Sequence, residues 1–132
     1  MEYTFRKENR EYLRIQAKLP VRYRFLTEQR SGPELKLVYE GRTENVSGGG
    51  ILLQGRIPDE SWVPDLLCER VVLGIEITFP DKQEPVRALG RVAWVETKDP
   101  HTMECHLGIK FREITRKDQD RLFQFVIENQ FV

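Results

Sequence analysis

The sequence predicts a mainly β fold, in which six short antiparallel strands form a closed or nearly closed barrel and one helix follows at the C-terminus. Apolar and polar residues alternate in several short segments separated by turn signals, as in half-buried strands. Helical spacing of apolar residues occurs only after Thr115. Closure of the sheet would protect the edges of six short strands. Strands and helices do not alternate, so a Rossmann or other doubly wound fold is not expected.

The first half of the chain contains three of the predicted strands. In residues 19–25 apolar side chains alternate with Arg22 and Arg24, which is typical of a strand with one buried face. A turn at residues 31–33 leads to a second strand over residues 35–43. A third strand begins at Ile51, directly after three glycines.

The second half contains the other three strands, over residues 71–79, 86–96 and 107–111, with turns at residues 80–82 and 99–100. Residues 56–65 carry two prolines and a tryptophan and match no regular element.

The C-terminal helix is predicted over residues 116–129. Thr115 and Asp118 resemble an N-terminal cap, since the hydroxyl and the carboxylate can both satisfy free amides of the first turn. Leu122, Phe125 and Val126 then recur at helical spacing, so the helix is expected to pack on the sheet or to close one end of the barrel.

Length and charge limit the function. The 132 residues fit one domain, and the 21 basic residues balance the 21 acidic ones. A protein that coats DNA or RNA usually has a basic excess, so neither polymer is an expected partner. Residues 1–30 hold eight bases and four acids, a local charge of +4. This basic patch is either a solvated surface or a site for a small anion.

Cysteine usage and hydropathy indicate a cytoplasmic protein with reduced thiols. The two cysteines, Cys68 and Cys105, lack CxxC spacing and nearby histidines, so neither a disulfide framework nor a metal site is expected. The N-terminus does not resemble a signal peptide, and no apolar run approaches the roughly 20 residues of a membrane-spanning helix, so membrane insertion is not expected.

Two short motifs carry the chemistry. Arg10 and Arg14 are four residues apart, and each arginine can grip a phosphate or a guanine edge with two parallel hydrogen bonds. Residues 45–50 read Asn-Val-Ser-Gly-Gly-Gly, which offers a hydroxyl, an amide and flexible main chain whose N–H groups can bind an anion. Alternative interpretations are an ordinary basic surface for the arginines and, for the second motif, a tight turn or a glycosylation sequon.

Together the motifs fit RxxxR and [D/N]xSxxG, and their order and separation resemble the PilZ domain, a bacterial receptor for cyclic di-GMP. The segments 19–23, 90–95 and 108–111 also resemble strands of that family, so the resemblance covers nearly the whole chain. It implies a PilZ-like split barrel over residues 18–132, preceded by an arginine-bearing switch loop over residues 1–17.

The resemblance also implies a binding site. Arg10 and Arg14 would contact guanine edges and phosphates, while Asn45, Ser47 and Gly50 would form the floor. Many members have aspartate at the position of Asn45, and the amide lacks the charge that favours guanine, so the affinity is expected to be lower.

Further contacts are considered at three positions. Members with an additional arginine directly before RxxxR tend to hold a stacked ligand dimer, but this chain has Asn9 there. One ligand molecule per domain is therefore expected. Gly49 lies in the glycine segment, and Trp94 is either a stacking residue or part of the core or rim of the barrel.

The sequence thus favours a non-catalytic cyclic di-GMP receptor that needs no cofactor and signals to a protein partner in a motility, exopolysaccharide or regulatory pathway. His101 and His106 have no evident triad partners. One alternative is a PilZ-like adaptor that binds protein but no nucleotide. Another is an oligonucleotide-binding barrel, which the neutral charge and the absence of clustered aromatic residues on the predicted strands disfavour. Residues 62–67, which are rich in apolar side chains, either bind a partner or cover the barrel.

Overall fold

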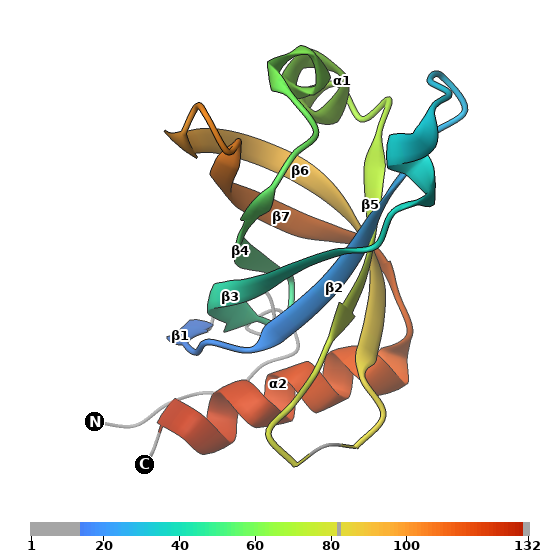
Figure 1. The fold of residues 1–132 in the computed structure, drawn as a ribbon. Coiled ribbons are helices and arrows are strands. Elements are labelled where there is room, and N and C mark those ends of the chain that lie inside the picture. Colours follow the sequence, from blue (N-terminus) through green and yellow to red (C-terminus); the bar gives the residue numbers. More distant parts are fainter. Residues whose placement is uncertain (1–13, 82, 131–132) are drawn as a thin grey trace.

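The computed structural model describes residues 14–81 and 83–130, and Figure 1 shows their arrangement. The elements in chain order are β1 (Arg14–Gln16), β2 (Pro20–Leu26), η2 (Pro33–Lys36), β3 (Tyr39–Ser47), β4 (Gly50–Arg56), η3 (Glu60–Trp62), α1 (Val63–Leu67), β5 (Val72–Ile77), β6 (Val86–Asp99), β7 (Glu104–Ile114) and α2 (Arg116–Gln130).

Strands β2 to β7 form the predicted six-stranded antiparallel barrel. Their order is β3-β2-β5-β6-β7-β4, and β4 pairs back onto β3 to close the sheet. A seventh strand, β1, was not predicted. It pairs with the last residues of β3, on the edge whose first residues pair with β2. Residues 14–16 of the predicted N-terminal loop are therefore part of the sheet.

The second predicted strand was placed too early. Residues 33–36 form the 3-10 helix η2, because Pro33 stands at its first position and favours a helical start. The strand β3 begins only at Tyr39 and continues through Ser47, because Val46 faces the core and is fully buried. The first half of the Asn45–Gly50 motif is thus strand, and the turn itself is only Gly48 and Gly49.

The unassigned segment closes one end of the barrel (Figure 1). Asp59 begins η3 by accepting a hydrogen bond from the Ser61 amide at 2.8 Å, and the short helix α1 follows. Trp62 and Leu66 are buried, and the Arg30 guanidinium lies 4.3 Å from the Trp62 ring centroid. These two apolar residues therefore cover the barrel, and only Leu67 of their neighbours is an exposed large hydrophobic residue.

Helix α2 closes the opposite end and agrees with the prediction (Figure 1). Thr115 caps it by accepting from the Asp118 amide at 3.1 Å. The Asp118 carboxylate does not complete the predicted cap. It accepts instead from the Arg87 amide at the start of β6, which ties the helix to the sheet. Leu122 and Val126 are fully buried.

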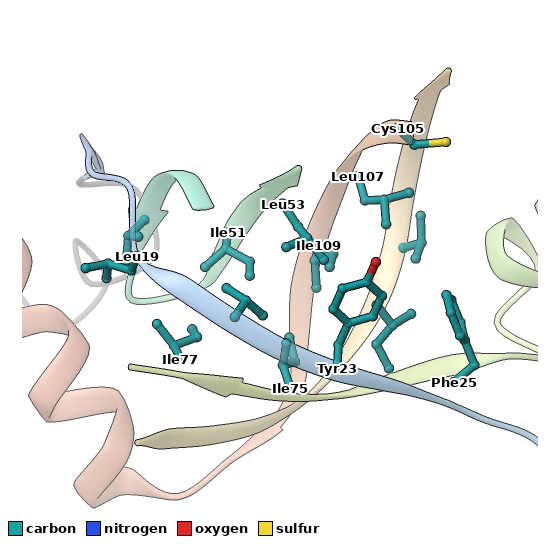
Figure 2. Packing of buried hydrophobic residues seen from close by; sticks show 14 of the residues in the cluster. Leu19, Tyr23, Phe25, Ile51, Leu53, Ile75, Ile77, Cys105, Leu107 and Ile109 are labelled. Carbon is teal, nitrogen blue, oxygen red and sulfur yellow. The ribbon is translucent and has the colours of Figure 1, made fainter. Parts of the chain in front are cut away.

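The core fills the barrel with the inward-facing residues of every strand, and Figure 2 shows part of it. Tyr23 is the main polar group inside. Its hydroxyl accepts from the Arg56 amide at 2.7 Å and donates to the Arg56 carbonyl at 2.6 Å. Burial raises the pKa of Tyr23 well above its ordinary value, so it stays a neutral donor. The pairing of β3 with β4 ends at Arg42 and Gln54. Tyr23 therefore satisfies the Arg56 amide and carbonyl of β4, which lie beyond the last pair.

Thr43 holds β1 and β2 on one edge of β3. Its buried hydroxyl accepts from the Leu19 amide at 2.9 Å and donates to the Ala17 carbonyl. Ala17 and Leu19 lie in the break between the two strands. The main chain still bonds there from the Ala17 amide to the Glu44 carbonyl and from the Thr43 amide to the Leu19 carbonyl, and the Thr43 side chain satisfies the remaining Leu19 amide and Ala17 carbonyl.

We predict that Thr43→Val destabilises the fold by about 1–3 kcal/mol, because a group of the same shape leaves a buried amide and a buried carbonyl unpaired. Urea unfolding followed by circular dichroism measures the loss. Thr43→Ser keeps the hydroxyl and serves as the control. Equal stability of the valine variant and the unmutated chain would contradict the role given to this hydroxyl.

The two cysteines are free and differ in exposure, and this predicts their reactivity. Cys68 is exposed, whereas Cys105 is buried on β7 and burial raises the pKa of its thiol. Thiolate is the reactive form, so Ellman's reagent at pH 8 should label one thiol per folded chain and two after unfolding in guanidinium. Cys68→Ser should leave the folded chain unlabelled, and rapid labelling of this variant would contradict the burial of Cys105.

Candidate functional site

The pairing of β1 with β3 brings the two sequence motifs together. Arg14 lies opposite Ser47 and Gln16 lies opposite Asn45, although 33 and 29 residues separate them in the chain. Side chains of directly opposed residues share one face of the sheet. Ile15 and Val46 pack against the core between them. Arg14, Asn45 and Ser47 therefore face the outside of the barrel.

Ser47 organises the turn that follows. Its hydroxyl oxygen accepts from the amides of Gly49 and Gly50 at 3.2 and 3.1 Å, and the hydroxyl donates to the Gly50 carbonyl at 3.2 Å. The Gly49 carbonyl accepts from the Phe111 amide at 2.9 Å. The Gly48 carbonyl accepts from the Gln119 side chain of α2 at 3.1 Å.

These bonds correct the expectation of free main-chain amides. The N–H groups of Gly49 and Gly50 are already satisfied by Ser47, and Gly32 is the only described glycine with a positive φ. The turn is therefore not an open anion-binding nest. Gly50 is required for a different reason: a Cβ there would lie 2.1 Å from the Ile109 carbonyl oxygen, so glycine lets β4 approach β7.

A cavity of about 330 Å³ opens above these residues. The lining includes six of the predicted site residues, namely Arg14, Asn45, Ser47, Gly49, Gly50 and Trp94. The other two, Arg10 and Asn9, lie outside the described residues.

Trp94 reaches the cavity through an irregularity in β6. Val92 pairs with Ile109 and Trp94 pairs with Gly108, so Ala93 is an extra residue. The bulge leaves Ala93 and Trp94 both exposed. The indole rests on Gly108, where an added Cβ would lie 2.1 Å from its Nε1 atom. Trp94 is 44% exposed and belongs to the cavity wall, not to the core.

Lys110 was missed by the sequence interpretation. It lies opposite Gly50 in the pairing of β4 with β7 and lines the cavity. Its position two residues after Gly108, on the same strand face, was the available signal. With Arg14 it gives two cations to the lining, and the described residues of the lining include no carboxylate, imidazole or thiol. The cavity is thus suited to an anion with many hydrogen-bond acceptors.

A second depression of about 480 Å³ shares Asn45 with this cavity. Gln16, Lys18 and His106 contribute to its lining. The Asn45 side chain makes no hydrogen bond with any other described residue, so its amide can donate and accept toward either depression.

Two further observations concern the described residues as a whole. No three His, Cys, Asp or Glu side chains among them gather as a metal ion would require. In the same part of the chain, no helix combines the length and the apolar character needed to cross a bilayer.

Comparison with known families agrees with the predicted family and fold. Residues 7–128 match the PilZ domain. The chain belongs to the PilZ domain family. No curated protein matches it in sequence.

Solved structures share the PilZ fold at low identity. The inhibitor of motility MotI/DgrA of Bacillus subtilis has a TM-score of 0.60 and 20% identity, and the match covers 90% of this chain and 49% of that one. The PilZ domain of CeSA from a cellulose-synthesizing bacterium has a TM-score of 0.55 and 15% identity, with coverage of 89% and 97%. The PilZ domain with c-di-GMP of YcgR from Escherichia coli has a TM-score of 0.56 and 10% identity, with coverage of 89% and 88%.

Proposed function

We propose that this PilZ domain is a non-catalytic receptor for cyclic di-GMP, acting in the cytoplasm of a bacterium and needing no cofactor. The observation that carries the proposal is the pairing of Arg14 with Ser47, which places an arginine of the first motif in the cavity floored by the second. Among the described lining residues, two cations and no carboxylate favour a dianionic ligand. The YcgR domain whose structure contains c-di-GMP shares the fold.

Each side chain would contribute by its chemistry. Arg14 and Lys110 would bind phosphate oxygens or the O6 and N7 atoms of guanine. Asn45 would hydrogen bond to a guanine, since its amide is uncommitted. Trp94 offers an exposed ring for stacking on a base. The hydroxyl of Ser47 already donates once and accepts twice, so its main role would be to shape the turn.

Within the N-terminal segment of residues 1–17, the part that precedes β1 would be the moving part. β1 anchors its C-terminal end beside the cavity, and Arg10 lies four residues before Arg14. Binding would bring Arg10 against the ligand and change the surface that a protein partner meets. The partner would belong to a motility, exopolysaccharide or regulatory pathway.

Calorimetric titration with cyclic di-GMP tests the proposal. We expect one ligand per chain and at least about tenfold weaker binding by Arg14→Ala and Arg10→Ala, because each removes charge-assisted hydrogen bonds. Arg112→Ala removes an exposed arginine that lines neither depression and should bind normally.

Absence of binding by the unmutated chain would reject the nucleotide and leave the protein-binding adaptor as the function. Binding that is equal in all three variants would place the ligand elsewhere on the domain.

The Gln119 side chain links α2 to the turn beside the cavity, because it donates a hydrogen bond to the Gly48 carbonyl. Gln119→Leu removes the hydrogen bond that holds the Gly48 carbonyl, so the turn that carries Gly49 and Gly50 loses its contact with the helix. We expect weaker binding of cyclic di-GMP, by about 1 kcal/mol. Gln124→Leu on the same helix is the control, because Gln124 is exposed and its one side-chain hydrogen bond among the described residues is with Glu128.

Calorimetry and thermal unfolding of both variants separate binding from stability. Gln119→Lys retains a donor and should recover part of the affinity. A loss of melting temperature in Gln119→Leu with unchanged affinity would assign this contact to stability alone.

A further inference from the structure

A third depression, of about 530 Å³, lies on the outer face of β2, β5 and β6 and shares no lining residue with the proposed nucleotide cavity. The strand register arranges its outward side chains in rows across β5. Arg22 lies opposite Glu76, which lies opposite Arg87. In the next row, Gly74 lies between Arg24 and Leu89.

Gly74 has no evident purpose within the fold. A glycine inside a strand costs roughly 0.5–1 kcal/mol relative to alanine. The nearest atom to a Cβ added at Gly74 would be Leu26 Cδ1 at 3.3 Å, which is the tip of an exposed side chain that can move. The φ angle of Gly74 is not positive, so the backbone does not require glycine either. Five other strand glycines have a steric reason, since a Cβ would come within 2.1–2.5 Å of a neighbour at Gly41, Gly50, Gly55, Gly90 and Gly108.

The missing side chain leaves the floor of the depression open at the centre of the sheet. A glycine within a strand often marks a bulge, a tight bend or a site where a ligand or another backbone approaches closely, and the pairings of Gly74 with Arg24 and Leu89 have no register shift. Leu26 and Val38, which are 42% and 38% exposed, add apolar surface beside it.

The charges that line the depression are unbalanced. Among the described residues, three arginines and one glutamate line it, a net of two positive charges. Glu40, which lies opposite Arg22 on β3, is outside this lining. Glu76 is paired with Arg87 at 3.2 Å. Arg22 and Arg24 are exposed and form no ion pair with any other described residue. Both guanidinium groups are therefore available to carboxylates.

We propose that this face is a docking surface for an acidic segment of a partner protein. The segment crosses Gly74, places carboxylates against Arg22 and Arg24, and packs an apolar side chain against Leu26 and Val38. A nucleic acid fits less well, because the Glu76 carboxylate lies within the depression and the chain has no net positive charge. The proposal does not depend on nucleotide binding.

Selection from a random peptide library displayed on phage tests this surface. The library is selected on the unmutated chain after depletion on Arg24→Glu, and recovered peptides are synthesised for affinity measurements. We expect peptides rich in Asp and Glu that bind at least about tenfold more weakly to Arg22→Glu and to Gly74→Val. Arg112→Glu, with the same charge change outside the depression, should bind them normally.

Thermal unfolding shows whether weaker peptide binding by Gly74→Val comes from a folded protein. Gly74→Val should fold and be no less stable than the unmutated chain, since valine favours strands. If this variant does not fold, the peptide affinity of Arg22→Glu alone tests the proposal. Neutral or basic peptides, no peptide that discriminates between the chains, or unchanged binding by the folded depression variants would overturn the proposal. Arg24-dependent binding of a 20-nucleotide single strand in place of acidic peptides would also overturn it.

Discussion

The pairing of β1 with the end of β3 is the interaction on which the candidate site depends. It brings Arg14 beside Ser47 and Gln16 beside Asn45, and it fixes which face of the sheet their side chains occupy. One edge of β3 carries both β1 and β2, and two main-chain hydrogen bonds, from Ala17 to Glu44 and from Thr43 to Leu19, hold the chain between them. The Thr43 hydroxyl completes this connection, which makes a buried threonine in the barrel wall a determinant of the site outside it.

The barrel then supplies the opposite wall of the cavity through small residues. Gly50 allows β4 to approach β7, Gly108 leaves room for the Trp94 indole, and the bulge at Ala93 turns that indole outward. Helix α2 contacts both β1 and β3, and Gln119 binds the turn between β3 and β4. A change at the cavity would therefore reach the helix directly, and affinity and helix position would be coupled in both directions.

Elements in which apolar residues recur at regular spacing could be predicted from the sequence. Strands β2 and β5 alternate cleanly, and α2 has both a cap and an apolar stripe. The spacing of apolar residues does not predict elements that are very short or that begin at an unexpected residue. β1 has only three residues, the helices η3 and α1 are too short to show a period, and β3 begins late because Pro33 starts a helical turn.

The site was predictable only in part. The motifs identified Arg14, Asn45, Ser47, Gly49 and Gly50, which line one cavity. The sequence did not reveal that the Ser47 hydroxyl accepts hydrogen bonds from the amides of Gly49 and Gly50, since that depends on turn geometry. For Lys110 the available signal was its position two residues after Gly108 on the same strand face, whereas the outward orientation of Trp94 depends on a bulge that no local pattern in the chain specifies.

The cavity between β1 and the strands β3, β4, β6 and β7 is the proposed site for cyclic di-GMP. An amide and side-chain NMR titration of the full chain with cyclic di-GMP tests this proposal. We expect shift changes concentrated at Arg14, Asn45–Gly50, the Trp94 indole and Lys110, with secondary changes at the Gln119 side chain. Changes centred on β2 and β5, or no changes at saturating ligand, would contradict it.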